Sequence, residues 1–118
     1  MQYEKLRVWQ FSFALTKKIY KQSEKWKDYG LKDQIRRATV SIVSNIAEGE
    51  ERQTLKESIR FLYIAKGSAG EVLTQLMLAR EFGYLDDKLA DEYELLVRDI
   101  SKMLAGLISS RVIKIQTG

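Results

Sequence analysis

The sequence predicts an all-α protein, folded as an antiparallel up-down-up-down four-helix bundle that forms one domain over residues 1–118. Apolar residues recur every three or four positions along four long stretches, which is the period of a helix that buries one face. No proline interrupts these stretches, and no alternation of apolar and polar residues typical of a strand is present. Short turns join the stretches, so helices that are consecutive in the chain must lie antiparallel.

The first predicted helix runs from Glu4 to about Lys27 and has two apolar faces. One face holds Val8, Phe11, Leu15, Ile19 and Trp26; the other, well over a quarter-turn away, holds Leu6, Trp9, Phe13 and Tyr20. A bundle core uses only one face, so we expect another copy of the protein to cover the second. The predicted break after this helix lies at residues 28–30, with Gly30 as a left-handed helix stop.

The second predicted helix runs from Leu31 to Glu51 and presents three different faces. Its apolar stripe holds Leu31, Ile35, Ala38, Ile42, Asn45, Ile46 and Gly49; a polar row holds Arg37, Ser41, Ser44 and Glu48; a third side holds Arg36, Val40, Val43 and Ala47. Asn45 is polar within the apolar stripe, and such a residue is best known for fixing register and assembly. For Arg37, a structural ion pair and a contact to nucleic acid remain equally open.

The third predicted helix begins after Thr54, which forms a capping box with Glu57, and runs to about Phe82. Its main stripe consists of Leu55, Ile59, Leu62, Ala69, Leu73 and Leu76. Gly67 and Gly70 lie inside it, where glycine costs about 1 kcal/mol relative to alanine. We favour close approach of a neighbouring helix as the reason for these glycines, with close approach of a ligand as the alternative.

The fourth predicted helix follows Gly83, a helix stop, and is capped by Asp86 or Asp87. Its stripe consists of Leu89, Tyr93, Leu96, Ile100, Met103 and Leu107, and the helix runs to near Arg111. We expect residues 113–118 to form a frayed tail.

Composition excludes several classes of function. The chain has no cysteine and no histidine, so it lacks thiolate chemistry, the commonest general base and the commonest transition-metal ligand. We therefore expect no enzyme activity, no cofactor and no metal site, and we expect the protein in the cytoplasm. No apolar run is long enough to span a membrane. The net charge is +4, and the basic excess is concentrated in the first helix.

Rows of basic residues offer candidate contacts to nucleic acid. Lys17, Lys18, Lys21 and Lys25 follow the first helix, and Lys56, Arg60 and Tyr63 share one side of the third. Cations one turn apart suit successive phosphates and a nearby tyrosine suits stacking, although spacing alone favours a solvated helix face. Residues 61–64 are apolar all round the third helix, so Tyr63 joins Trp9, Phe13 and Tyr20 as a candidate for self-association, which explains the surplus apolar surface better than membrane docking.

Four stretches of the chain also resemble a known family: LRVWQ near the start, residues 29–49, RFLYIAKGSAGE over residues 60–71, and GYL over residues 83–85. They are similar to the four-helix-bundle family named for proteins encoded in 23S rRNA intervening sequences, over residues 3–111. Two motifs that occur together in this chain are fairly specific for that family. The first, SI-x-x-NIAEG, includes Asn45, Glu48 and Gly49; the second, A-x-GSA-x-E, includes Gly67 and Ser68.

This resemblance implies an up-down-up-down bundle and a barrel-shaped homopentamer. The chain is also similar to the accessory protein of diversity-generating retroelements, which is basic and associates with nucleic acid and a reverse transcriptase. That similarity implies Arg36, Arg37, Arg60 and Lys66 as candidate nucleic-acid contacts and implies no catalytic residue. The sequence therefore predicts a non-enzymatic oligomer that binds structured RNA or DNA through phosphates, with a protein-interaction scaffold as the alternative.

Overall fold

The computed structural model describes residues 1–118 and contains four α-helices after a short 3₁₀ turn. The turn η1 spans Gln2–Lys5, and the helices are α1 (Arg7–Ser23), α2 (Tyr29–Glu50), α3 (Leu55–Glu81) and α4 (Asp87–Thr117). No strand is present, so the predicted fold class is confirmed. None of the helices is both long and apolar enough to cross a membrane.

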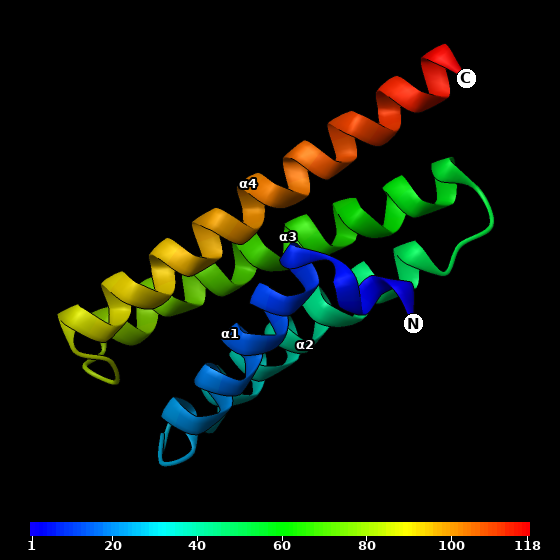
Figure 1. Ribbon diagram of the computed structural model, residues 1–118. Helices are drawn as coiled ribbons and strands as arrows, with labels where there is room; N and C mark the ends of the chain where they lie inside the picture. The colour runs from blue at the N-terminus through cyan, green and yellow to red at the C-terminus, as the bar shows by residue number, and fades with distance from the viewer.

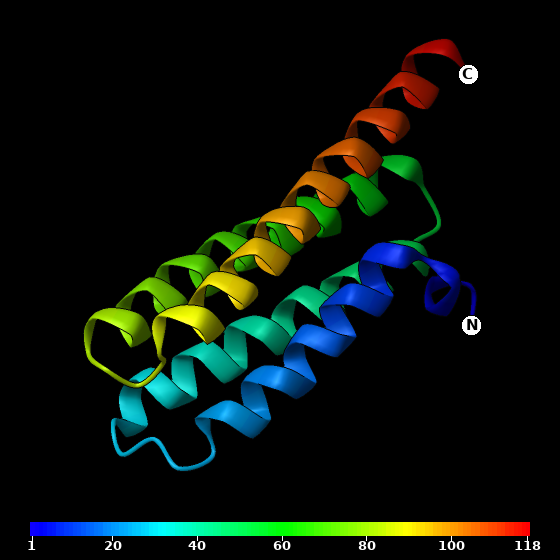
Figure 2. The same ribbon diagram turned by 60° about the vertical axis from the view of Figure 1, so that its left-hand side comes forward.

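The helices form an elongated antiparallel bundle of about 50 × 21 × 21 Å (Figure 1). Each helix packs along the next one in the chain, and α1 also packs along α4, so that α1 lies diagonally across the bundle from α3, and α2 from α4. Figure 2 shows α1 beside α2 and α3 beside α4, with both chain ends near the α2–α3 turn. The predicted up-down-up-down topology is therefore confirmed.

The core is a single aliphatic cluster to which all four helices contribute. Leu15 and Ile19 of α1, Ile42 of α2 and Leu62 of α3 are almost fully buried. The buried seam of α4 differs from the predicted stripe and consists of Ala90, Tyr93, Val97, Ile100, Leu104 and Ile108. Tyr93 and Ile100 belong to both sets. The other members of the predicted stripe are only partly buried at the edge of the core: Leu89, Leu96, Met103 and Leu107. Helix α4 is thus rotated relative to the orientation that its spacing suggested.

Local signals set most helix ends. The side chains of Thr54 and Asp86 accept hydrogen bonds from backbone amides in the first turns of α3 and α4. Gly83 has φ of 82° and follows the end of α3, as predicted. The prediction for Gly30 was wrong, because the carboxylate of Asp28 caps α2 and places Gly30 in the first turn of that helix. Only Gly83 in the chain has a positive φ.

Helix α1 ends at Ser23, earlier than predicted, and the chain then turns so that Trp26 still reaches the core. The Trp26 ring lies 5.4 Å from that of Tyr84 in the α3–α4 turn, so the two turns pack together at this end of the bundle.

Helix α4 continues to Thr117, so the predicted frayed tail is helical instead. Arg111 holds this extension against the bundle, because its guanidinium hydrogen-bonds to Glu50 at the end of α2 and to Ser58 in α3. The Arg111 and Glu50 side chains are only 14% and 16% exposed, which makes this a largely buried ion pair. Beyond it, the red end of α4 projects past the other helices in Figure 1.

Candidate nucleic-acid interface

The predicted basic residues do not gather on one surface. Lys17, Lys18 and Lys21 are exposed along α1, and the Lys17 ammonium lies 5.4 Å from the centre of the Phe13 ring. Lys56 and Arg60 are exposed on the first turns of α3. Helices α1 and α3 lie diagonally across the bundle from each other, so these two rows form separate basic surfaces.

Arg36 and Arg37 are neighbours in sequence with different roles. Arg36 donates from Nε to the Ser23 hydroxyl and from Nη2 to the carbonyl of Tyr20, both at 2.8 Å. Its guanidinium also lies 4.4 Å from the centre of the Tyr20 ring. Arg36 therefore binds one carbonyl and one hydroxyl in the last turn of α1, where a cation stabilises a helix C-terminus. This hydrogen bonding uses two of the five guanidinium N–H donors and holds the group at the end of α1.

Arg37 points to solvent, with a side chain that is 78% exposed. It forms an ion pair with Asp33, one turn earlier on α2, at 2.8 Å, and this hydrogen bond raises the pKa of Arg37. The pair lies next to a polar groove of about 280 Å³ between α2 and α3, whose lining includes Glu71. Both carboxylates oppose an anionic ligand there.

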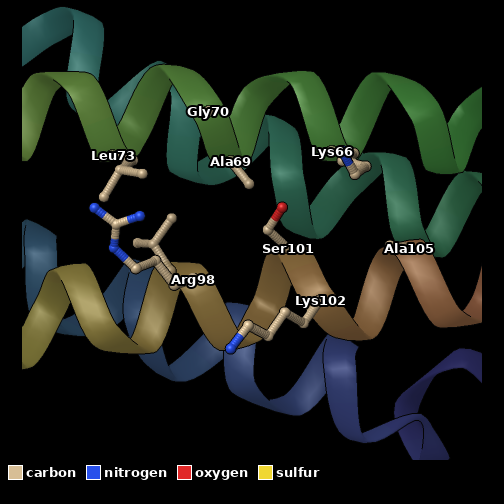
Figure 3. A pocket seen from close by; sticks show the side chains of 9 residues that line it. Lys66, Ala69, Gly70, Leu73, Arg98, Ser101, Lys102 and Ala105 are labelled. Carbon is tan, nitrogen blue, oxygen red and sulfur yellow. The ribbon is translucent and has the colours of Figure 1, made fainter.

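Lys66 is the predicted basic residue that the structure brings together with others. Lys66, Arg98 and Lys102 line one groove between α3 and α4 with a volume of about 500 Å³, and the Lys102 ammonium points away from α3 (Figure 3). The rest of the lining consists of Ala69, Gly70, Leu73, Val97, Ser101 and Ala105, and so contains no carboxylate. None of the three cations forms an ion pair within the chain. In Figure 3 the Ser101 hydroxyl points toward α3 and Arg98 reaches toward Leu73.

Sequence reasoning missed Arg98 and Lys102. Their spacing of one turn on α4 was a usable signal, because such a pair shares one face of a helix. The small residues Ser101 and Ala105 alongside them also indicated a shallow surface. What the pattern lacked was the orientation of α4, which decides whether this face lies beside Lys66.

The glycines of α3 have no neighbouring helix of this chain against them. No atom lies within 4 Å of the position that a Cβ would take at Gly67 or Gly70. The favoured explanation, close approach of another helix of the bundle, is therefore wrong within this chain. Gly70 instead lines the α3–α4 groove, where its lack of a side chain leaves the backbone open to a ligand.

The motif residues of α2 tie this helix to α3. The Asn45 side-chain amide donates to the carbonyl and the hydroxyl of Ser41, and the Ser41 hydroxyl lies 2.7 Å from that of Ser68. Gly49 is buried, and a Cβ there would lie 3.2 Å from the carbonyl oxygen of Ser58. Both features fix how α2 packs on α3. Glu48 instead forms an ion pair with Arg52 at 2.6 Å.

The second apolar face of α1 is partly exposed. Phe13 and Tyr20 are 44% and 40% exposed, and beside them on α2 lies Val43, with which they line an apolar hollow of about 290 Å³. Trp9 is half-buried and its ring lies 5.0 Å from that of Phe13. Tyr63, 58% exposed, lies on α3 and therefore apart from the other three candidates for self-association.

No group of three or more carboxylates in the structure is arranged to hold a metal ion. Several acidic residues instead cap helices or pair with arginines. Arg80 of α3, for example, binds Asp91 and lies near Asp87 and Glu94 of α4. These contacts raise the pKa of Arg80, chiefly through the hydrogen bond to Asp91.

Comparisons with known proteins agree with this architecture. The family model of the 23S rRNA-intervening sequence protein matches residues 4–106. A crystal structure of a protein with unknown function from the S23 ribosomal protein family of Bacteroides thetaiotaomicron is similar, with a TM-score of 0.81 and 28% identity. The likeness covers 86% of this chain and 97% of that one. No curated protein matches the chain.

The similarity to retroelement accessory proteins is not shown by these matches and stays an expectation. The family match itself spans all four helices and ends within α4, before the extension that Arg111 holds. As the sequence motifs implied, the chain belongs to the 23S rRNA-intervening sequence protein family.

Proposed function

We propose that this protein is a non-enzymatic, self-associating four-helix bundle that binds RNA or DNA through phosphate groups. The observation that supports this best is the α3–α4 groove, where Lys66, Arg98 and Lys102 surround a hollow without any carboxylate in its lining. By contrast, four arginines elsewhere in the chain have acidic partners: Arg37, Arg52, Arg80 and Arg111. Unpaired cations that line one groove favour a polyanion, because binding releases the counterions of its phosphates.

Such contacts provide affinity without sequence specificity. Lysine ammonium and arginine guanidinium groups bind phosphate oxygens, which are the same at every nucleotide. The lining offers Ser101 as its one side-chain hydroxyl and has no asparagine or glutamine, the side chains that pair with adenine edges. We therefore expect similar affinity for unrelated sequences.

A filter-binding titration over a range of salt concentrations tests this function. Three phosphate contacts predict a slope of about −2 to −3 for log K against log salt concentration. Lys102→Glu should reduce affinity about tenfold or more, since it reverses a charge in the groove. Lys88→Glu is the matched control, because Lys88 is an exposed residue in the first turns of α4 and does not line the groove. Absence of any retained RNA or DNA at low salt would reject the function.

A protein-interaction scaffold is the second candidate, supported by the exposed apolar face of α1 and α2. Phe13, Tyr20 and Val40 are all about 40% exposed, which is costly unless something covers them. A scaffold predicts a partner that a pull-down from native lysate recovers even at high salt. Recovery of the protein alone would count against it.

Self-association belongs to both candidates, and the family resemblance implies a homopentamer. Sedimentation at micromolar concentration should give an oligomer, and Phe13→Glu should shift it toward the monomer because a charge would be buried in the contact. The proposal of self-association rests on the aromatic face of α1. A wild-type protein that sediments as a monomer would contradict this proposal.

A further inference from the structure

The α3–α4 groove has an apolar floor between charged rims. Ala69 of α3 and Val97 of α4 are almost fully buried and form the floor, whereas Arg98 and Lys102 are exposed at the rim. Gly70 leaves the α3 side open, because no side chain projects there. Figure 3 shows Ala69 and Ser101 lying between the two helices, with Lys102 extending along the outer side of α4. A ligand that fills this groove must carry negative charge and also present a flat or apolar part.

The charge of this groove is not a general property of the contact between α3 and α4. Nearer the α3–α4 turn, Arg80 of α3 is bound by Asp91 and lies within 4 Å of Asp87 and Glu94. In the groove, the corresponding cations have no acidic partner. Along the contact between α3 and α4, the cations that line the groove therefore have no acidic partner, whereas Arg80 does.

The width of the groove limits what can reach its floor. Packed helices have axes about 8–10 Å apart, so a groove along their contact is narrow, and the small residues Ala69, Gly70 and Ser101 open it here. A duplex is much wider and can touch only the rims through its phosphates, which leaves the apolar floor exposed to water. The volume of about 500 Å³ lies in the range of sites that hold a small organic ligand. A nucleotide has the matching chemistry, with an apolar base face and an anionic phosphate.

From this geometry we infer that the α3–α4 groove binds an unpaired nucleic-acid strand in preference to a duplex, an inference that rests on the proposed function. A base or ribose lies on Ala69 and Val97, next to the bare backbone of Gly70. The phosphates on either side are bound by the rim cations, and the Ser101 hydroxyl is available to the sugar or base.

The test compares one RNA sequence of about 12 nucleotides, labelled with fluorescein, as a single strand and as a blunt duplex. Fluorescence anisotropy with the full chain at low salt should show about tenfold tighter binding of the strand. Gly70→Leu should weaken strand binding about tenfold and change duplex binding less than about twofold, because it fills the groove without changing charge. Gly106→Leu is the matched control, since Gly106 is also exposed and open but does not line the groove.

Circular dichroism first establishes that each variant folds. If Gly70→Leu does not fold, Ala105→Leu replaces it, because it narrows the same groove from the α4 side. Equal affinity for strand and duplex, unaffected by Gly70→Leu, would overturn this inference and leave the proposed function intact. Binding of neither form at low salt would instead remove the proposed function. A glutamate peptide of equal charge that binds more tightly than the RNA, and loses affinity in Gly70→Leu, would assign the groove to an acidic polypeptide and overturn the inference.

Discussion

Replacing Gly67 by alanine should stabilise the protein, whereas the same replacement at Gly49 should destabilise it. Within a helix, alanine is favoured over glycine by about 1 kcal/mol, through backbone entropy lost on folding. At Gly67 the new methyl group would meet no atom within 4 Å, so that gain of about 1 kcal/mol is not offset. At Gly49 the methyl would lie 3.2 Å from the carbonyl oxygen of Ser58 and 3.4 Å from Cβ of Phe61.

Overpacking of this kind costs about 1–3 kcal/mol, because α2 and α3 must separate slightly to admit the methyl. The two variants should therefore differ in their free energy of unfolding by about 2 kcal/mol, in favour of Gly67→Ala. Each 1 kcal/mol corresponds to a shift of about 3–6 °C in Tm for a domain of this size.

Urea unfolding followed by far-ultraviolet circular dichroism measures both variants, at two fixed protein concentrations so that self-association is controlled. A Gly67→Ala variant that loses as much stability as Gly49→Ala at both concentrations would refute the reasoning. It would mean that the new methyl meets an obstacle, and the open space at Gly67 would not exist in solution.

Three further predictions follow from the polar contacts. Arg36→Ala should cost about 1–3 kcal/mol in a urea titration because it removes the hydrogen bonds to the end of α1. Arg37→Ala is the matched control, since Arg37 is exposed, and should leave the urea midpoint unchanged. Arg111→Leu leaves the mostly buried Glu50 unpaired, so it should cost about 2–4 kcal/mol and speed amide hydrogen exchange in residues 112–117; unchanged exchange there would contradict the anchoring role. Burial raises the pKa of Tyr93, so its stabilising contribution is complete below the ordinary tyrosine pKa near 10 and is lost as pH rises through the higher folded value. Between pH 8 and strongly alkaline pH, Tyr93→Phe should therefore lose less stability than the wild type, measured by urea unfolding at each pH.

Much of the fold was accessible to sequence reasoning because helix formation depends on neighbours in the chain. The hydroxyl of Thr54 and the carboxylate of Asp86 cap amides only three residues away, and Gly83 adopts a positive φ that suits glycine. The same local logic failed at Gly30, because Asp28 provided a stronger signal to begin a helix than glycine did to end one. It also failed at the C-terminus, where the long-range partners of Arg111 extend α4.

The sequence by itself determined the number and approximate bounds of the helices, the antiparallel topology and the family, since each depends on periodicity, turn residues or motifs. Only the tertiary structure decided which polar side chains meet. The apolar stripe of α4 is broad enough to allow several rotations about the helix axis. The rotation adopted buries Val97 and Leu104 and places Arg98 and Lys102 along the groove that Lys66 also lines. The same packing commits Arg36 to the end of α1. Whether a cation is free to bind a ligand depends on the carboxylates and carbonyls that packing brings to it, and these come from distant parts of the chain.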